Sequence, residues 1–220
     1  MNTQTEELSR RDHIGQMITP TLMVPRDSAP PECRIGQTRF LMASDGLYIE
    51  TRVPFGSLVR RLWTLERGVP LPYGDVSERD DFGFILRSRL LPLISETMLP
   101  AAALQAEKEE EWAGLIVWDG AEFVPWAAEF ETGRDYAKSL DRGLADLPAG
   151  YSIACDIHSH HAMPPFFSPD DNTSDSGRVK IALVLGNYRT EDGVALFDVT
   201  GRYCVEGMFF DIPTWQEENK

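Results

Sequence analysis

Residues 151–160 read YSIACDIHSH, and this stretch decides how the second half of the chain is interpreted. Apolar and polar side chains alternate along it, which is the period of a β-strand with one buried face. The strand would direct Tyr151, Ile153, Cys155 and Ile157 to one face, and Ala154, Asp156, His158 and His160 to the other. Because the apolar set would face the core, His158 and His160 would stand side by side at the strand end. There, both imidazoles could reach one metal ion.

The residues after this strand add a hydroxyl and a carboxylate. The loop at 161–171, HAMPPFFSPDD, returns Ser168 and Asp171 to the histidines and completes the spacing H-x-H-x7-S-x2-D. Two imidazoles and one carboxylate leave a tetrahedral Zn²⁺ ion one open position for water, as catalytic zinc sites do. The ion would lower the pKa of that water toward about 7, and Ser168 would donate its hydroxyl to an oxyanion.

Each part of this pattern also has a purely structural interpretation. An isolated H-x-H is more often a surface strand than a metal site, and Ser-Pro-Asp-Asp alone is a turn or a helix cap. We interpret His161, Asp170 and Asp175 as bystanders, with Asp170 the substitute ligand if the register differs by one. The combined spacing favours the metal site.

The composition restricts the class of protein. The chain has 220 residues and a formal net charge of −14, which disfavours nucleic acid and anionic membranes as ligands. It has no apolar run long enough to span a bilayer, and MNTQTEELSRRDHIG at its start lacks the apolar segment of a secretory signal. Cys33, Cys155 and Cys204 form no C-x-x-C pair, which indicates a reducing compartment and no thiolate zinc site. We therefore expect a cytoplasmic protein.

The first part of the chain predicts a leader and a small β-rich module. Residues 1–35 are polar and proline-rich and indicate an irregular leader. Two β-rich runs, Thr38–Ala43 and Leu47–Val53, flank Asp45-Gly46, which is a strong hairpin signal. A short helix is expected at 57–68, followed by a loop. The module would cover residues 36–90.

The second part predicts an α+β domain over residues 91–215, followed by a tail at 216–220. A helix is expected from Pro100 through residue 112, because its residues are strong helix formers. Leu115–Trp118 and Glu122–Ala127 would form a hairpin, and Tyr136, Leu140, Leu144 and Leu147 have the spacing of an amphipathic helix. The remaining strands are expected at Tyr151–Ile157 and Val179–Leu185, and at Val194–Val199 paired with Arg202–Phe210. This order of elements indicates a mixed sheet with helices.

The combined pattern resembles the JAMM (JAB/MPN-type) zinc metalloproteases. Their motif is H-[ST]-H-x7-S-x2-D, with an upstream glutamate in an E-x-x-G-L context. The motif is matched here by His158, Ser159, His160, Ser168 and Asp171, and Glu111 begins EWAGL at 111–115. The resemblance covers roughly residues 92–212. One departure is His161, where many members have proline after the second histidine.

This resemblance implies a fold, a cofactor and a role for each residue. The fold would be JAB/MPN-like (cytidine-deaminase-like), a mixed β-sheet flanked by helices. One Zn²⁺ per chain, with a bound catalytic water, would be held by His158, His160 and Asp171. Glu111, which composition alone would assign to a solvated acidic run, would be the general acid/base, and Ser168 would stabilise the oxyanion. The reaction would be hydrolysis of an amide bond.

Two segments of the amino-terminal half indicate a narrower group among the proteins that carry this domain. LMASDGLYIETR at 41–52 and VPLPYGDVSE at 69–78 look like the bacterial PRTRC system protein A group, from a ParB-related, ThiF-related cassette. This implies a ubiquitin-like protein substrate, processed or deconjugated at its C-terminus, and a ThiF/E1-like enzyme as partner. A catalytically silent interaction scaffold and a zinc hydrolase of a small-molecule amide conjugate stay open. The role of residues 1–90 also stays open, as substrate recognition, dimerisation or a lid.

Overall fold

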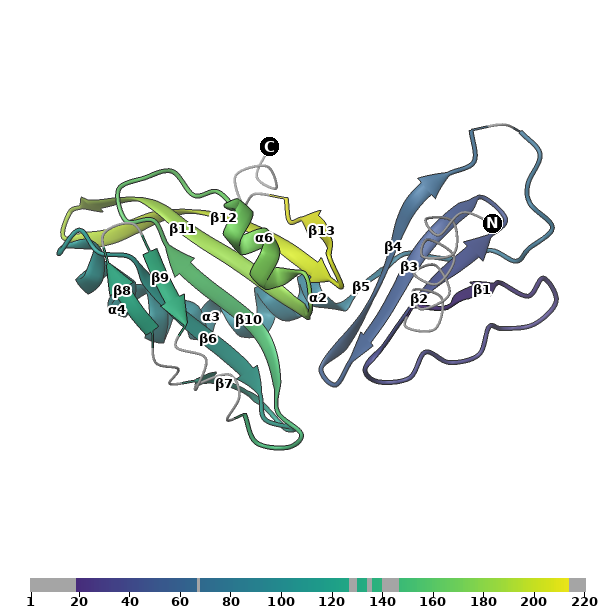
Figure 1. Ribbon diagram of the computed structural model, residues 1–220, viewed down its shortest axis with the longest axis horizontal. Helices are drawn as coiled ribbons and strands as arrows, with labels where there is room; N and C mark the ends of the chain where they lie inside the picture. Colours follow the sequence, from purple (N-terminus) through teal and green to yellow (C-terminus); the bar gives the residue numbers. More distant parts are fainter. Residues whose placement is uncertain (1–18, 67, 127–129, 134–135, 140–146, 214–220) are drawn as a thin grey trace, which may run out of the picture. The chain divides into compact units, whose positions relative to one another are not determined.

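The computed structural model describes residues 19–66, 68–126, 130–133, 136–139 and 147–213. The chain divides into two compact units, Met1–Asp81 and Phe82–Lys220. Each unit contains its own main sheet (Figure 1). Residues 1–18 of the predicted leader and the predicted tail at 216–220 lie outside the described residues.

A five-stranded sheet forms the first unit. Its strands are β1 (Thr21–Met23), β2 (Gln37–Ala43), β3 (Gly46–Val53), β4 (Gly56–Thr64) and β5 (Arg79–Asp80), in the order β1-β2-β3-β4-β5. The predicted hairpin around Asp45-Gly46 is confirmed, with Ala43 opposite Gly46. Glycine is required at position 46 because a Cβ atom would collide with the carbonyl oxygen of Trp63. Leu41, Tyr48 and Val59 are buried together in the core of this unit.

The prediction of a short helix at 57–68 is wrong, because most of this segment forms β4. β4 pairs with β3 along its length, from Val53 opposite Gly56 to Gly46 opposite Thr64. Helix propensity is a weak preference that tertiary contacts override. Here the pairing satisfies the exposed edge of β3 and buries Leu58 and Val59.

The main sheet of the second unit is mixed, as the sequence predicts, and it has six strands. Its strands are β6 (Trp112–Trp118), β7 (Phe123–Trp126), β10 (Ser152–Ser159), β11 (Val179–Glu191), β12 (Val194–Val205) and β13 (Met208–Asp211). Their order is β13-β12-β11-β10-β6-β7, in which β10 and β11 are parallel and the other pairs antiparallel. β8 (Phe130–Gly133) and β9 (Tyr136–Ser139) form a separate two-stranded sheet.

One continuous helical run covers residues 81–106. It consists of α2 (Asp81–Ile85), α3 (Leu91–Leu93) and α4 (Leu99–Ala106), joined by two π-helical turns, η1 (Leu86–Leu90) and η2 (Ile94–Met98). Pro92 and Pro100 each lie in the turn after a π-helical turn. A proline lacks an N–H and its ring crowds the carbonyl four residues earlier, which favours such local widening. The helix predicted from Pro100 to residue 112 therefore begins earlier and ends earlier.

The helical run at 81–106 lies on one face of the six-stranded sheet, and α6 (Pro169–Asp175) lies on the other face (Figure 1). The ring of Phe82, in α2, packs edge-on against Tyr203 of β12. Arg202, the residue before Tyr203 on β12, points to the other face and bonds to α6. The sheet thus has an apolar face toward the helical run and a face with charged residues toward α6.

Two further predictions about the second unit are wrong. Tyr136–Ser139 is strand β9 instead of the start of a helix, and residues 140–146 lie outside the described residues. β12 also runs without a break through Gly201, so the expected turn near that residue does not form. The turn occurs instead at Glu206 and Gly207, which both have positive φ. In the described part of the chain, no helix is long and apolar enough to cross a membrane.

Candidate metal centre

The end of β10 carries the two histidines on one face. His158 is partly exposed, His160 is 5% exposed, and their ring centroids lie 5.1 Å apart. The side chains between them alternate as expected, because Ser159 is fully buried and its hydroxyl accepts the backbone N–H of Trp112 at 2.9 Å. The strand therefore presents both imidazoles toward the side on which α6 lies.

The first turn of α6 places Asp171 beside the histidines. Ser168 is the N-cap residue, and its hydroxyl accepts the N–H of Asp171 at 3.1 Å. The Asp171 carboxylate accepts the N–H of Ser168 at 2.6 Å in return, so the two residues form a capping box. The other carboxylate oxygen of Asp171 lies 3.7 Å from Nε2 of His158. The S-x2-D spacing therefore caps a helix and directs a carboxylate to His158 at the same time.

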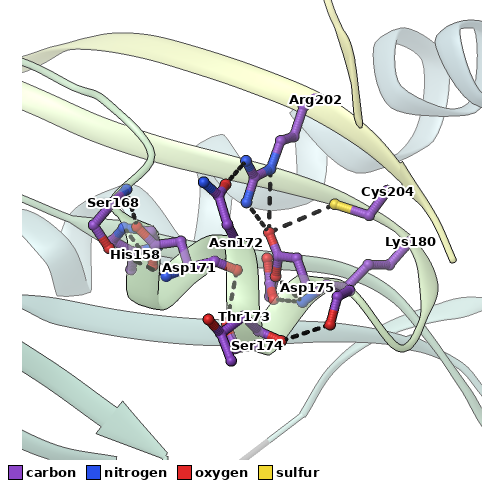
Figure 2. Close-up of polar contacts among 12 residues, drawn as sticks. His158, Ser168, Asp171, Asn172, Thr173, Ser174, Asp175, Lys180, Arg202 and Cys204 are labelled. Atoms are coloured by element: carbon purple, nitrogen blue, oxygen red, sulfur yellow. Dashed lines mark hydrogen bonds and ion pairs between the residues drawn. The ribbon is translucent and has the colours of Figure 1, made fainter. Parts of the chain in front are cut away.

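These three residues make a cluster that fits a metal ion. One ligand atom from each of His158, His160 and Asp171 lies within 4.8 Å of the other two. Two imidazole nitrogens and one carboxylate oxygen are a donor set that suits zinc, and three protein ligands leave a position for water or substrate. Figure 2 shows His158, Ser168 and Asp171 gathered at one end of α6.

The loop after β10 orients His160. Nδ1 of His160 lies 3.3 Å from the carbonyl oxygen of Pro164, so a proton on Nδ1 leaves the Nε2 lone pair for a metal. The ring of Phe166 packs against the His160 ring in a T-shaped arrangement at 4.5 Å. Burial lowers the pKa of His160, as do nearby His158 and His161, which favours the neutral form that binds metals.

Backbone hydrogen bonds hold this loop to β11. The N–H of His160 donates to Leu185, that of Asn187 to Met163, and that of Tyr188 to His161. Gly186 lies in the same place, and a Cβ atom there would collide with the backbone of residues 163–165. Its lack of a side chain therefore permits the close approach that places the Pro164 carbonyl beside His160.

Glu111 directly precedes β6 (Trp112–Trp118), next to the histidine end of β10. Glu109 adopts a left-handed conformation, with φ of 58°, where the chain turns from α4 toward β6. Trp112 pairs with Ser159 and Ala113 with His158, so Glu111 directly precedes the residue that pairs with the end of the histidine strand. Glu111 is 6% exposed, whereas Glu107 and Glu109 are exposed.

Of the predicted bystanders, Asp175 has an extensive set of partners that the sequence analysis missed. Its carboxylate accepts bonds from Lys180 at 2.6 Å and from Arg202 at 2.6 and 3.2 Å. Lys180 also pairs with Asp156, which shares the face of His158. Burial raises the pKa of Asp156 although Lys180 opposes this, whereas burial of Asp175 is outweighed by Lys180 and Arg202, which keep its pKa low. The sequence does contain a signal for these partners. Lys180 in VKIALVL and Arg202 in GRYCV are charged residues within apolar strands, and a charged residue in a buried strand needs a partner.

The other two predicted bystanders are outside the metal cluster. Asp170 is exposed in the first turn of α6, and the cluster found among the described residues uses Asp171. His161 is buried and has a positive φ of 38°, at the point where the chain leaves β10. Its carbonyl accepts the N–H of Tyr188 at 2.8 Å, which is a structural contact.

Comparisons with known proteins separate the chain into the same two parts. Residues 9–83 match a family model described as a domain of unknown function, DUF2016. Residues 99–198 match a model described as prokaryotic homologs of the JAB domain. None of the curated proteins with which the sequence was compared matches it.

One similar solved structure is the solution structure of protein DSY2949 from Desulfitobacterium hafniense. It is 17% identical, with 54% of this chain and 84% of that chain covered and a TM-score of 0.38. This likeness carries no argument about the chain. The match over residues 99–198 shows that most of the second unit is similar to prokaryotic homologs of the JAB domain.

Proposed function

We propose that the second unit is a zinc-dependent peptidase of the JAMM type, which hydrolyses an amide bond at the C-terminus of a ubiquitin-like protein. The observation that carries the proposal is the convergence of His158, His160 and Asp171, with the buried Glu111 at the adjacent strand end. The match to the JAB domain supports a peptidase or a scaffold role. The cluster favours the peptidase, because a scaffold has no need of a metal-binding donor set.

The ligand residues are held by groups of the chain itself. The Asp171 carboxylate would bind through the oxygen nearer His158, since the other oxygen accepts the Ser168 N–H. His160 would bind through Nε2, with its Nδ1 proton held by the Pro164 carbonyl. A zinc ion bound there would supply a water of lowered pKa and a positive charge near the substrate carbonyl.

Two further side chains would act on the substrate. The Glu111 carboxylate would accept a proton from the attacking water and deliver it to the leaving amine nitrogen. The Ser168 hydroxyl already accepts the N–H of Asp171, and because a hydroxyl can also donate, its proton would stabilise the developing oxyanion. Phe166 covers one side of His160 and would limit access of bulk water.

The substrate class follows from the amino-terminal resemblance to the PRTRC system protein A group. A ThiF/E1-like enzyme of such a cassette would activate or attach the ubiquitin-like protein, and this chain would process its tail or remove it from targets. Residues 9–83, which contain the resembling segments at 41–52 and 69–78, would contribute to substrate recognition.

The test is hydrolysis of a ubiquitin-like protein of the cassette fused through its C-terminus to a reporter. Wild-type protein should release the reporter, and a chelator should stop the reaction. Glu111→Gln should lower turnover by about 10²–10⁴-fold while zinc stays bound, because general acid/base catalysis contributes that much. Glu107→Gln, at an exposed position nearby, should behave as wild type.

Two results would contradict the proposal in different ways. Full activity of Glu111→Gln would show that Glu111 is not the proton-transfer residue. If zinc-loaded wild-type protein cleaved small amide conjugates but no protein fusion, the proposed substrate class would be wrong. The proposed metal chemistry would still stand.

A further inference from the structure

We infer that Arg202, acting through α6, is a positioning residue that sets Asp171 in register with the two histidines. The inference rests on the proposed function only in taking His158, His160 and Asp171 as metal ligands. Arg202 lies on β12, two strands away from β10, and its guanidinium reaches the chain on both sides of Asp171.

Arg202 contacts the α6 segment at three points. Nη1 donates to Oδ1 of Asn172 at 2.5 Å, and Nη2 and Nε donate to one oxygen of Asp175 at 2.6 and 3.2 Å. The guanidinium also lies 3.8 Å from the ring centroid of Phe167, the residue before the Ser168 N-cap. The contacts therefore include a residue before the helix, one beside Asp171 and one at the end of the helix.

The guanidinium is itself fixed in place. The ring of Phe209, on the neighbouring strand β13, lies 3.9 Å from it, so the planar group is held between two aromatic rings. Arg202 is 4% exposed and the Asp175 side chain 5% exposed. A buried, forked ion pair with stacked rings has one well-defined geometry, which a flexible ammonium group does not provide.

A second cation connects the same carboxylate to the histidine strand. Lys180, on β11, donates to Asp175 at 2.6 Å and also pairs with Asp156 of β10. Asp156 precedes His158 by two residues and therefore shares its face. Two carboxylates and two cations thus balance in charge and connect the end of α6 to β10, β11 and β12. Figure 2 shows Asp175 with Lys180 and Arg202.

The ion pairs at the end of α6 are needed because the local contacts of Asp171 cannot fix its position relative to the sheet. The capping box fixes Asp171 relative to Ser168, which belongs to the same segment. The contact of Asp171 with His158, at 3.7 Å between partly exposed groups, is weak. A helix of seven residues is also too short to be stable by itself. The position of Asp171 relative to the sheet therefore depends on the ion pairs at the other end of α6.

The test measures Co²⁺ affinity of the full-length apoprotein by competition with a chelator, together with the visible absorption of bound Co²⁺. Arg202→Lys keeps the positive charge beside Asp175 but loses the fork, the Asn172 bond and the stacking. Its affinity should fall by about tenfold or more, as is usual when a supporting partner of a ligand is altered, and the spectrum should change. Because the defect would lie in metal binding, excess metal should restore the activity of Arg202→Lys.

Ile181→Val is the matched control, because Ile181 is buried on β11 and points away from the α6 face. It should lower the unfolding temperature while leaving Co²⁺ affinity and spectrum unchanged. Asn172→Ala, at an exposed position, removes one Arg202 bond and should weaken binding a few-fold. If Arg202→Lys does not fold, the Co²⁺ affinity of Asn172→Ala tests the positioning role instead.

The outcomes separate the two proposals. Wild-type affinity and spectrum in Arg202→Lys, or in Asn172→Ala if the former does not fold, would overturn the positioning role and leave the proposed function intact. Equal weakening in Ile181→Val would also overturn it, since the effect would then follow stability alone. A wild-type protein that binds no Co²⁺ would overturn both.

Discussion

Burial separates Glu111 from the acidic residues that precede it. Glu107 and Glu109 are exposed, whereas Glu111 is buried and its backbone N–H donates to the carbonyl of Gly133. Burying an acidic residue costs free energy, and ionisable residues in such costly environments cluster at functional sites. The burial of Glu111, after exposed Glu107 and Glu109 and half-buried Glu110, therefore supports a role for it at the histidine end of β10.

Ser168 combines two roles at the scale of one residue, and its substitution should show both. Ser168→Ala should lower turnover by about 10²–10³-fold through loss of an oxyanion donor. It should also lower the free energy of unfolding by about 1 kcal/mol, because an N-cap is lost. Reporter release and urea unfolding measure the two effects separately.

Two variants make this prediction specific. Ser168→Thr keeps the hydroxyl and should retain most of both properties. Ser176→Ala removes an exposed serine at the other end of α6 and should leave turnover unchanged. Wild-type turnover in Ser168→Ala would show that the hydroxyl serves the helix cap alone.

At the scale of elements, the contact between the loop at 160–166 and β11 determines how His160 is held. Gly186→Ala would place a methyl group against the backbone of Met163 and Pro165. We expect a loss of about 1–3 kcal/mol in the free energy of unfolding from overpacking, together with weaker zinc binding. Gly177→Ala, where a Cβ atom would meet open space, is the control. Unchanged zinc affinity in a folded Gly186→Ala protein would show that the loop does not orient His160.

The attachment of α6 to the sheet should depend on pH. Burial would raise the pKa of Asp175, but Lys180 and Arg202 outweigh it and hold the pKa below the ordinary value of 3.8. A carboxyl group with a lowered pKa in the folded state stabilises the fold above its unfolded pKa. This contribution disappears as the pH falls through the folded value.

Asp175→Asn should therefore cost about 3 kcal/mol near neutral pH, since it leaves Arg202 and Lys180 short of one negative charge. The difference in unfolding free energy between wild type and variant should shrink as the pH falls below about 4. Urea unfolding at a series of pH values measures it. A difference that stays constant down to about pH 2 would mean that Asp175 does not carry the charge of this network.

Most strands of the second unit could be predicted from sequence, because their signals are local. The alternation from Cys155 to His160 identifies both the strand and the face of its histidines, and Ser168 with Asp171 has the spacing of a capping box. The prediction that Tyr151 and Ile153 share the face of Cys155 is wrong, because a β-bulge between Ile153 and Cys155 turns them to the face of His158. The segment at 57–68 could not be assigned this way, since β4 forms only through its pairing with β3. The continuous helix around Pro92 and Pro100 was missed because proline usually marks a helix boundary, whereas here π-helical turns accommodate it.

The support for the site was less predictable than its ligands. Arg202 and Asp175 are separated in the sequence, and their pairing depends on the order of β10, β11 and β12 in the sheet. A charged residue in a buried strand indicates that a partner exists, but only the topology identifies the partner. The motif in the sequence therefore predicted the cluster of His158, His160 and Asp171, and the ion-pair network that connects α6 to the sheet was left out.

At the scale of the whole molecule, the two compact units differ in what they contribute. Every residue of the candidate metal centre, including Glu111 and the Arg202 network, belongs to Phe82–Lys220. The first unit has its own sheet and apolar core, and its matching family model carries no function in its description. The chemistry we propose is thus a property of the second unit, and the first would act in selecting the substrate.

Metal content tests the central claim most directly. Full-length protein, supplied with zinc and then dialysed, should contain about one zinc ion per chain by elemental analysis, as a single three-ligand site requires. His158→Ala should lose most of the bound zinc while its secondary structure is unchanged. Folded wild-type protein without zinc after the same treatment, or a His158→Ala variant with full zinc content, would contradict the assignment of this cluster as a metal centre.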